Sequence, residues 1–264
     1  MTHDQPCPSE EPHVFTTVRY DPALLHSAEN TEASCHRPCP FYMLEHHWTR
    51  LQVAKWNTSM AGSGPSQLLQ GLLHGVKQWH AKNPGKEMHS LRCKHRVYPD
   101  GHTTSEIAPT PSLSMEDLFP RTLGKIEGGT DEVDWVVYID PDSCEVSAST
   151  MYKTWDRFFY DRARKSTGIT HLYDKKEVLL YNTDSEILDA SISTPYFFRD
   201  GRWVTPAAAC GGQQGTTRRW SLEQRLCEEA VVKKESMRNG EIIWLSNAVR
   251  GYYRARFVEH LNED

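Results

Sequence analysis

The sequence predicts an α+β protein in two lobes, residues 13–112 and 133–264. The first lobe combines strand-like runs with two long stretches of helical periodicity. The second lobe is mainly strand-like, with alternating runs and frequent turn signals. Between them, residues 113–132 lie in the stretch PTPSLSMEDLFPRTLGKIEGGTDEVD, which has Pro, Gly and Ser but no sustained period. This composition is typical of a linker.

The first lobe is expected to begin with a strand at VFTTVRY (14–20), which is β-branched and aromatic. Apolar residues at helical spacing predict helices within 43–57 and 65–83. Residues 89–109 predict two short strands around a PDG turn. The polar, Pro-containing residues 1–12 are expected to form a loose tail.

The second lobe is expected to start with a buried strand, WVVYID (135–140), followed by a helix ending near Gly168. Residues 177–206 alternate strand-like runs with turns at NTDS and RDG, which predicts a meandering antiparallel sheet. GTTRRWSLEQRLCEEA (215–230) predicts a helix, and residues 240–259 predict the closing strands.

Composition excludes several classes of protein. The 264 residues carry a net charge of −5, so the chain lacks the basic footprint of a nucleic-acid or anionic-membrane binder. No apolar run approaches the roughly 20 residues that cross a bilayer, and the first residues lack the features of a signal peptide. Seven scattered cysteines favour reduced thiols. We therefore expect a cytoplasmic protein with a small-molecule ligand.

One cluster raises the alternative of a metal site. The stretch SCHRPCPFYMLEHH contains Cys35, His36, Cys39, His46 and His47. A C-x3-C pair followed by histidines is compatible with zinc. However, two prolines stiffen the spacer, and adjacent histidines on a helix point in different directions. We expect a loop leading into a helix, and no metal.

Two features indicate chemistry. GGQQGTTRRW leads from glycines into a helix start at Thr216 and Thr217, where free N–H groups and hydroxyls suit a phosphate. The alternative is that one threonine is only an N-cap. Lys153 follows SASTM, a short polar run leading into a helix. In a poorly solvated site its amine would form a Schiff base; otherwise it is a surface charge.

A reactive lysine and a phosphate cradle in one chain suggest pyridoxal phosphate. This cofactor also needs a carboxylate opposite its ring nitrogen. Asp189, in EILDASIST between two strand-like runs, is the candidate, and its alternative role is that of an ordinary turn residue.

Six segments in order resemble the fold-type IV, or class IV aminotransferase-like, pyridoxal phosphate enzymes, and among them the fungal 4-amino-4-deoxychorismate lyases. The resemblance covers nearly all of residues 13–256. It implies a small α/β N-terminal domain, a larger domain with an antiparallel, barrel-like core, and a homodimer. The segments are FTTVRYDPALL, FYMLEHHWTRL, YKTWDRFFYDRAR, EILDASISTPYFFRDGRWVTP, GQQGTTRRW and IIWLSNAVRG.

The resemblance also implies roles for individual residues. Lys153 matches the lysine that binds the cofactor covalently, and Asp189 falls where the family pairs a glutamate with the pyridine nitrogen. The phosphate-binding positions fall on Arg50 in HWTRL, Thr216, Thr217 and Asn247 in LSNA.

This chain departs from the family pattern at several positions. Asp189 is one methylene shorter than the usual glutamate, and Ala190 stands where glycine is usual. Phe158 replaces the tyrosine of transaminating relatives, whereas Arg157 resembles the K-x-x-[ND]-R pattern of the lyases and is expected to bind substrate. These two positions favour a lyase.

The resemblance therefore implies a lyase that converts 4-amino-4-deoxychorismate to 4-aminobenzoate and pyruvate, in folate biosynthesis. Lys153 would remove the ring proton, and Thr16 or Thr17 would assist protonation of the leaving group; the sequence does not choose between them. One alternative is an aminotransferase acting on a branched-chain or D-amino acid, or an amine. Another is a non-catalytic homologue that binds the cofactor poorly, with Asp189 as its sign.

Overall fold

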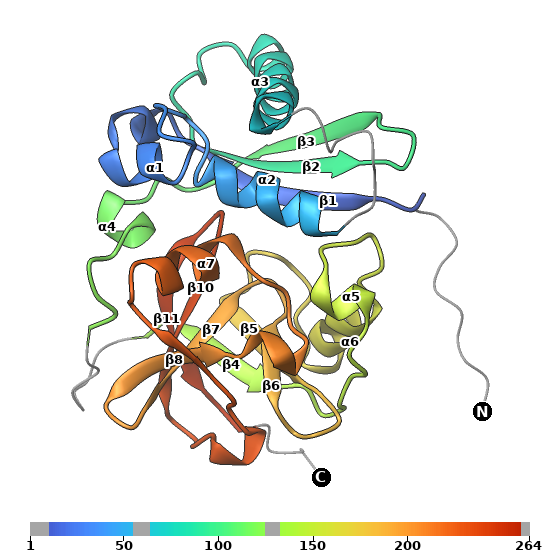
Figure 1. Cartoon of the computed structure of the whole chain (residues 1–264), viewed down its shortest axis with the longest axis vertical. Helices are drawn as coiled ribbons and strands as arrows, with labels where there is room; N and C mark the ends of the chain where they lie inside the picture. Colours follow the sequence, from blue (N-terminus) through green and yellow to red (C-terminus); the bar gives the residue numbers. More distant parts are fainter. Residues whose placement is uncertain (1–10, 55–63, 125–132, 260–264) are drawn as a thin grey trace.

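The computed structural model describes residues 11–54, 64–124 and 133–259. They form two lobes stacked one on the other (Figure 1). The small lobe is a three-stranded sheet with helices packed on it, and the large lobe is built on an eight-stranded sheet. Most of the expected tail at residues 1–12, together with Cys7, lies outside the described residues. The other six cysteines are free thiols.

The small lobe is an antiparallel sheet in the order β1 (Val14–Tyr20), β2 (Leu91–Val97), β3 (Thr103–Pro109). Helices α2 (Leu44–Val53) and α3 (Pro65–Lys82) pack against this sheet. Before α2, the chain forms η1 (Pro22–His26) and α1 (Ala28–Glu32). All the strands predicted here are confirmed, as are the helices within their predicted ranges; residues 55–57 lie outside the described part.

The large lobe contains a curled mixed sheet. Its ends approach each other, because Ile187 N donates to Val232 O at 2.8 Å and Glu186 forms a bridge with Lys233. This accounts for the barrel-like shape. In sheet order the strands are β6 (Ile187–Ala190), β5 (Lys176–Tyr181), β4 (Trp135–Ile139), β11 (Gly251–Phe257), β10 (Ile242–Asn247), β7 (Thr194–Arg199), β8 (Arg202–Pro206) and β9 (Glu228–Ala230).

Three predictions for the large lobe were wrong in part. Within residues 177–206, β5 and β6 pair antiparallel, as do β7 and β8, but β6 and β7 are not neighbours, so there is no continuous meander. The whole sheet is mixed, because β4 pairs in parallel with both β5 and β11, and β9 pairs in parallel with β8. The helix predicted over 215–230 is α7 (Thr216–Glu223), and it ends before β9. The run SASTM itself contains a helix, α5 (Ala148–Met151), so Lys153 follows a helix instead of preceding one directly. Helix α6 (Phe158–Ser166) agrees with its prediction.

The predicted linker also contains structure. Helix α4 (Met115–Leu118) begins at a capping box formed by Ser114 and Asp117, and four residues are too few to give a detectable period. Tyr42 of the small lobe donates its hydroxyl proton to Leu118 O. Phe119 packs edge-on against both Tyr42 and Trp220, so this segment contacts both lobes.

Backbone hydrogen bonds join the lobes on both sides of the gap between them. At one side, Phe15 N donates to Lys153 O and Trp155 N donates to His13 O, both at 2.9 Å. At the other, Arg19 N donates to Ala248 O at 2.9 Å. The fully buried side chain of Arg19 also donates to Val249 O and Pro111 O, at 3.1 and 2.8 Å.

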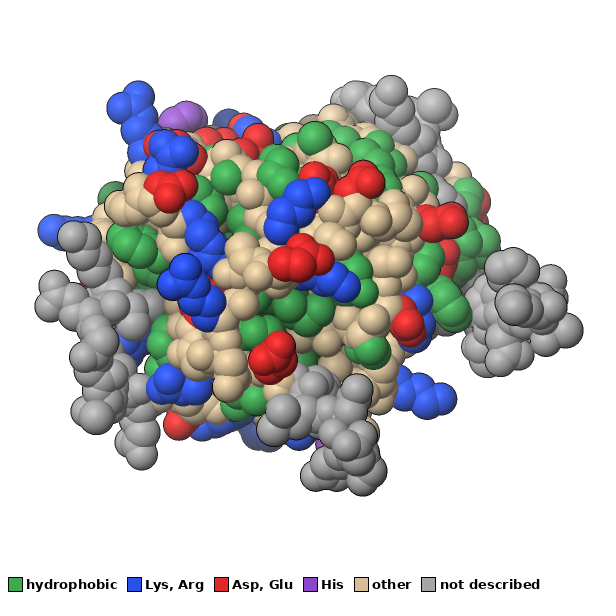
Figure 2. Space-filling model, turned by 90° about the horizontal axis from the view of Figure 1, so that it is seen from below, with side chains coloured by type: hydrophobic (Ala, Val, Ile, Leu, Met, Phe, Trp, Pro, Cys, Tyr) green, Lys and Arg blue, Asp and Glu red, His purple; other side chains and the backbone are tan. Residues whose placement is uncertain are grey.

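The underside of the large lobe carries acidic, basic and hydrophobic side chains intermingled (Figure 2). This mixture matches the near balance of charges in the sequence. Among the described helices, none has the length and apolar character needed to span a membrane.

Candidate active site

A cavity of about 790 Å³ lies where the small sheet meets the loops of the large lobe. Eight of the nine residues proposed from the sequence line it, and Thr16 is the exception. The eight come from both lobes and from segments as far apart in the chain as Thr17 and Asn247, and folding brings them to one place. They are Thr17, Arg50, Lys153, Arg157, Asp189, Thr216, Thr217 and Asn247.

Lys153 lies in the loop between α5 and α6. Its carbonyl accepts from Phe15 N, and its Nζ lies 5.3 Å from the centre of the Phe15 ring. Burial, reinforced by the positive charges of Arg157 and Arg50, lowers the pKa of Lys153 well below its ordinary value. The amine is therefore biased toward its neutral, nucleophilic form.

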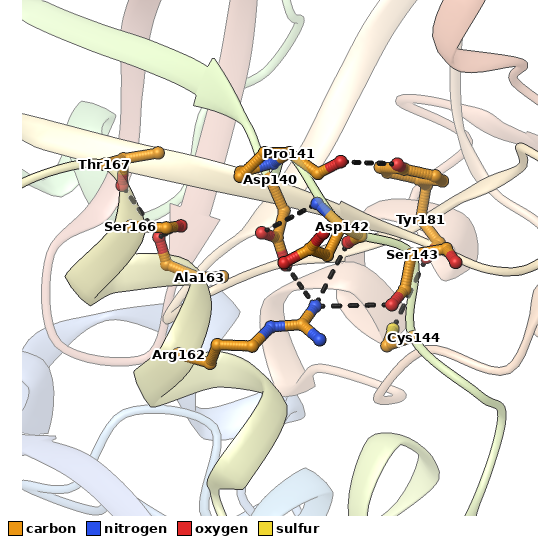
Figure 3. A network of polar contacts seen from close by, with 10 residues as sticks. All are labelled: Asp140, Pro141, Asp142, Ser143, Cys144, Arg162, Ala163, Ser166, Thr167 and Tyr181. Carbon is orange, nitrogen blue, oxygen red and sulfur yellow. Dashed lines mark hydrogen bonds and ion pairs between the residues drawn. The ribbon is translucent and has the colours of Figure 1, made fainter. Parts of the chain in front are cut away.

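The loop that leads to Lys153 is held by an arginine on α6 (Figure 3). Arg162 donates to Asp140 Oδ2 at 2.7 Å, to Asp142 O at 3.1 Å and to Ser143 O at 3.3 Å. Asp140 is almost fully buried, and burial raises its pKa in spite of this partner. The contact fixes the end of β4 against α6, and these two elements flank Lys153 in the chain.

Replacing Arg162 by alanine is expected to reduce the free energy of unfolding by about 2 kcal/mol, because a buried carboxylate loses its cationic partner. Chemical denaturation monitored by circular dichroism measures this. Arg219→Ala is the matched control, since Arg219 and Glu223 form an exposed pair whose loss should change stability by less than about 0.5 kcal/mol. Equal stabilities for the two variants would show that the Arg162 contact contributes nothing.

The start of α7 offers free donors to the cavity. The first N–H groups of a helix have no partner within the helix, and Thr216 and Thr217 occupy the first two positions after Gly215. Thr216 Oγ1 is buried and has no hydrogen-bond partner among the described residues. Thr217 Oγ1 accepts from Ser246 Oγ at 2.8 Å. This end of the cavity is suited to an anion.

Arg50 lies in the last turn of α2 and reaches the cavity from the small lobe. Burial lowers the pKa of Arg50 to about 10, which leaves the guanidinium charged at neutral pH. Its Nε is buried and has no partner within the described part of the chain. A half-buried cation with a buried, unpartnered donor is expected to bind an anion.

Asp189 lies on β6, and burial raises the pKa of its carboxyl to about 8. The Ala190 N–H and the positive charges of Lys153 and Arg157 oppose this rise only in part. A carboxyl group held in this way would bind a cation strongly, because pairing would relieve the cost of burying its charge.

A second buried carboxylate behind Asp189 escaped the sequence reasoning. Glu177 on β5 is fully buried and accepts from Ser191 Oγ and from Ile192 N. Arg164 donates to Ser191 Oγ at 3.1 Å, and Arg157 donates to Ser191 O at 2.6 Å. Glu177 therefore shapes the turn that follows Asp189. The available signal was a single acidic residue directly before the apolar run VLLY.

The structure distinguishes residues that the sequence left equivalent. Thr17 lines the cavity, whereas Thr16 faces away from it, as alternation along β1 requires. Arg157 lines the cavity, but Phe158 does not and is 49% exposed. The side chain of Asn247 is held by protein partners: Oδ1 accepts from Val249 N and Arg250 N, and Nδ2 donates to Ser193 Oγ at 3.2 Å.

Two of the residues suggested as metal ligands, His46 and His47, contact different partners. His46 Nε2 lies 3.1 Å from Glu223 Oε2, and His47 Nδ1 contacts Thr16. Within the described ranges, no three acidic, cysteine or histidine residues are grouped so as to hold a metal ion.

The cavity lining is strongly cationic. Nine arginines and lysines line it against three aspartates, so anionic ligands are favoured. The basic residues are Arg19, Arg50, Arg92, Lys94, Lys153, Arg157, Arg164, Lys175 and Arg250.

The comparisons with known proteins define the class. The family model for amino-transferase class IV matches residues 14–257, and the chain belongs to this family. The chain is 24% identical over 245 residues to a protein of Schizosaccharomyces pombe with the provisional name aminodeoxychorismate lyase, and the match covers 91% of this chain and 87% of that protein. It is 28% identical over 250 residues to the aminodeoxychorismate lyase of Saccharomyces cerevisiae, and this match covers 80% of this chain and 66% of that protein.

Solved structures agree on the fold. A hypothetical aminotransferase from Mycobacterium tuberculosis, in its alpha-ketoglutarate- and PMP-bound form, superposes with a TM-score of 0.61 at 15% identity, covering 98% of this chain and 90% of that one. This likeness confirms the two-lobed fold implied by the resemblance. The chain is thus an enzyme of the class IV aminotransferase fold.

Proposed function

We propose that the protein is a lyase that converts 4-amino-4-deoxychorismate to 4-aminobenzoate and pyruvate. The observation that carries this proposal is a cavity lined mainly by basic residues around the half-buried Lys153, in a chain similar along most of its length to two fungal proteins with that name. The substrate bears two carboxylates, which suit such a lining. Arg157 in the cavity, with Phe158 outside it, also supports a lyase.

The residues present fit pyridoxal 5'-phosphate. The unpartnered Thr216 Oγ1 and Arg50 Nε, with the free N–H groups at the start of α7, would hold the phosphate. Asp189 would pair with the ring nitrogen, and Lys153 would bind the cofactor covalently. When bound, this cofactor supplies an electron sink for the bond-breaking step.

In the proposed reaction, the protein's own groups position the substrate and move two protons. Arg157 would bind a carboxylate of the substrate. The neutral amine of Lys153, once free, would take the proton from the ring carbon, and the Thr17 hydroxyl would protonate the leaving group. The bond between the ring and the enolpyruvyl oxygen breaks, pyruvate leaves and the ring becomes aromatic. Positioning supplies much of the catalysis in such a site.

One experiment separates this proposal from its rivals. Purified protein with pyridoxal phosphate would be assayed for 4-aminobenzoate formation and, separately, for amine transfer from branched-chain and D-amino acids to a keto acid. Formation of 4-aminobenzoate alone supports the lyase. Keto-acid-dependent transfer alone would establish an aminotransferase, and absence of both with no cofactor bound would indicate a non-catalytic homologue.

The family resemblance also supports a homodimer whose two sites lie near the interface, and we propose this assembly. Size-exclusion chromatography with light scattering tests it directly. A monomer with full activity would contradict it.

Replacing Arg50 by alanine is expected to weaken cofactor binding at least tenfold, while turnover at saturating cofactor falls less. The reason is that a charge-assisted contact to a phosphate acts mainly on binding. Equilibrium titration with pyridoxal phosphate gives the Kd, and steady-state kinetics at saturating cofactor give kcat. An unchanged Kd would show that Arg50 does not hold the phosphate.

A further inference from the structure

The Nη2 group of Arg50 is connected to a short chain of hydrogen bonds inside the small lobe. Arg50 Nη2 donates to Thr16 Oγ1 at 2.5 Å, and the same oxygen lies 2.5 Å from His47 Nδ1. Thr16 and His47 are fully buried. Thr16 is on β1, whereas the other two residues lie on α2, so this chain of contacts links helix to sheet.

The direction of each hydrogen bond follows from the chemistry of arginine. A guanidinium group can only donate, so Thr16 Oγ1 must accept from Arg50. The single hydroxyl proton of Thr16 is then available to His47 Nδ1. This nitrogen also lies 3.4 Å from Arg50 Nη2, which can only donate, so Nδ1 acts as acceptor. That requires a neutral imidazole with its proton on Nε2. Burial, with the positive charge of Arg50, lowers the pKa of His47 well below its ordinary value, in agreement with this assignment.

We propose that Thr16 is a positioning residue, which orients the guanidinium of Arg50 for an anionic group and is itself oriented by His47. This inference rests on the proposed function, in which Arg50 holds the cofactor's phosphate. The long side chain of arginine otherwise loses rotamer freedom when it binds. A guanidinium that is already hydrogen-bonded at Nη2 loses less rotamer freedom when the ligand binds. Its other donors remain available for the ligand. Thr16 thereby acts on affinity through Arg50 and touches no reacting atom.

The test uses the full-length chain without cofactor and variants at position 16. Thr16→Val keeps the shape of threonine and removes the hydroxyl, so the Kd for pyridoxal 5'-phosphate, measured by tryptophan fluorescence, should rise about tenfold. Thr16→Ser restores the hydroxyl and should restore affinity. Pyridoxal without the phosphate should bind equally to all three proteins. Thr205→Val is the matched control, since it removes a buried hydroxyl whose hydrogen bond to Pro195 O lies outside the cavity.

A double-mutant cycle with Arg50→Ala decides between positioning and a general loss of structure. If Thr16 acts through Arg50, Thr16→Val should cause no further loss of affinity in the Arg50→Ala protein. A tenfold loss in that background, or an equal loss for pyridoxal, would overturn the inference. A wild-type Kd for Arg50→Ala would instead refute the role of Arg50 in the proposed function. If Thr16→Val does not fold, Thr16→Ala takes its place in the same cycle.

Discussion

Replacing Lys153 by alanine is expected to abolish turnover, with a loss of at least about 10³-fold. In the proposed reaction one amine has two tasks, since it binds the cofactor covalently and then removes a proton. The depressed pKa of Lys153 suits both, because a neutral amine is the nucleophile and the base. Steady-state formation of 4-aminobenzoate measures the loss. Activity within about tenfold of the unaltered protein would reject the assignment.

A second readout does not depend on activity. Borohydride reduction of the protein with bound pyridoxal phosphate, followed by peptide mass spectrometry, should place the cofactor mass on Lys153. Lys94 provides the control, because it lines the same cavity and its Nζ lies 4.6 Å from the same Phe15 ring. Lys94→Ala should retain the labelled peptide, and Lys153→Ala should lose it. Label on Lys94 would show that Lys94, and not Lys153, binds the cofactor covalently.

Replacing Asp189 by asparagine is expected to slow the reaction by about 10²-fold or more, while the cofactor still binds. Asparagine keeps the size of the side chain but cannot carry the negative charge that would keep the ring nitrogen protonated. A primary kinetic isotope effect with ring-deuterated substrate should increase as proton removal becomes slower. Near-normal rates together with an unchanged isotope effect would place Asp189 outside the reaction.

Glutamate at the same position is the more informative change, since it is the usual residue of the family. If the site has adjusted to aspartate, the longer side chain overpacks it and activity falls. If aspartate represents a partial loss of function, glutamate raises activity. We expect the fall, because Ala190 is fully packed and Gly212 lies directly against β6, where an added Cβ would be 1.8 Å from Leu188 O. A gain in activity would contradict this expectation.

Much of the fold was predictable because its long elements carry strong periods. The β-branched and aromatic residues of VFTTVRY gave β1 with its correct limits, and the repeated leucines of α3 gave that helix. Helices α4 and α5 have four residues each, which is too short for a period to be detected. The parallel neighbours of β4 also escaped prediction, because pairing between strands distant in sequence depends on the whole fold and not on local pattern.

The candidate site was predictable chiefly through family resemblance, because a lone lysine or aspartate has no distinctive sequence context. Eight of nine proposed residues do meet in one cavity. Thr16 and Thr17 could not be ranked beforehand, since the sequence does not show which face of β1 turns toward the large lobe. Glu177 was missed because its hydrogen bonds to the turn after Asp189 arise only when β5 and β6 pair.

The hydrogen bonds that join the two lobes have a consequence for the kinetics of ligand exchange. Contacts at Phe15 and Arg19 fasten β1 to the large lobe on both sides of the cavity. Moving the two lobes apart would break these buried hydrogen bonds together. We therefore expect ligands to enter the cavity without separation of the lobes. Stopped-flow binding of pyridoxine 5'-phosphate, which has no aldehyde to react with Lys153, should therefore show one phase whose observed rate rises linearly with ligand concentration, without the plateau of a slow conformational step.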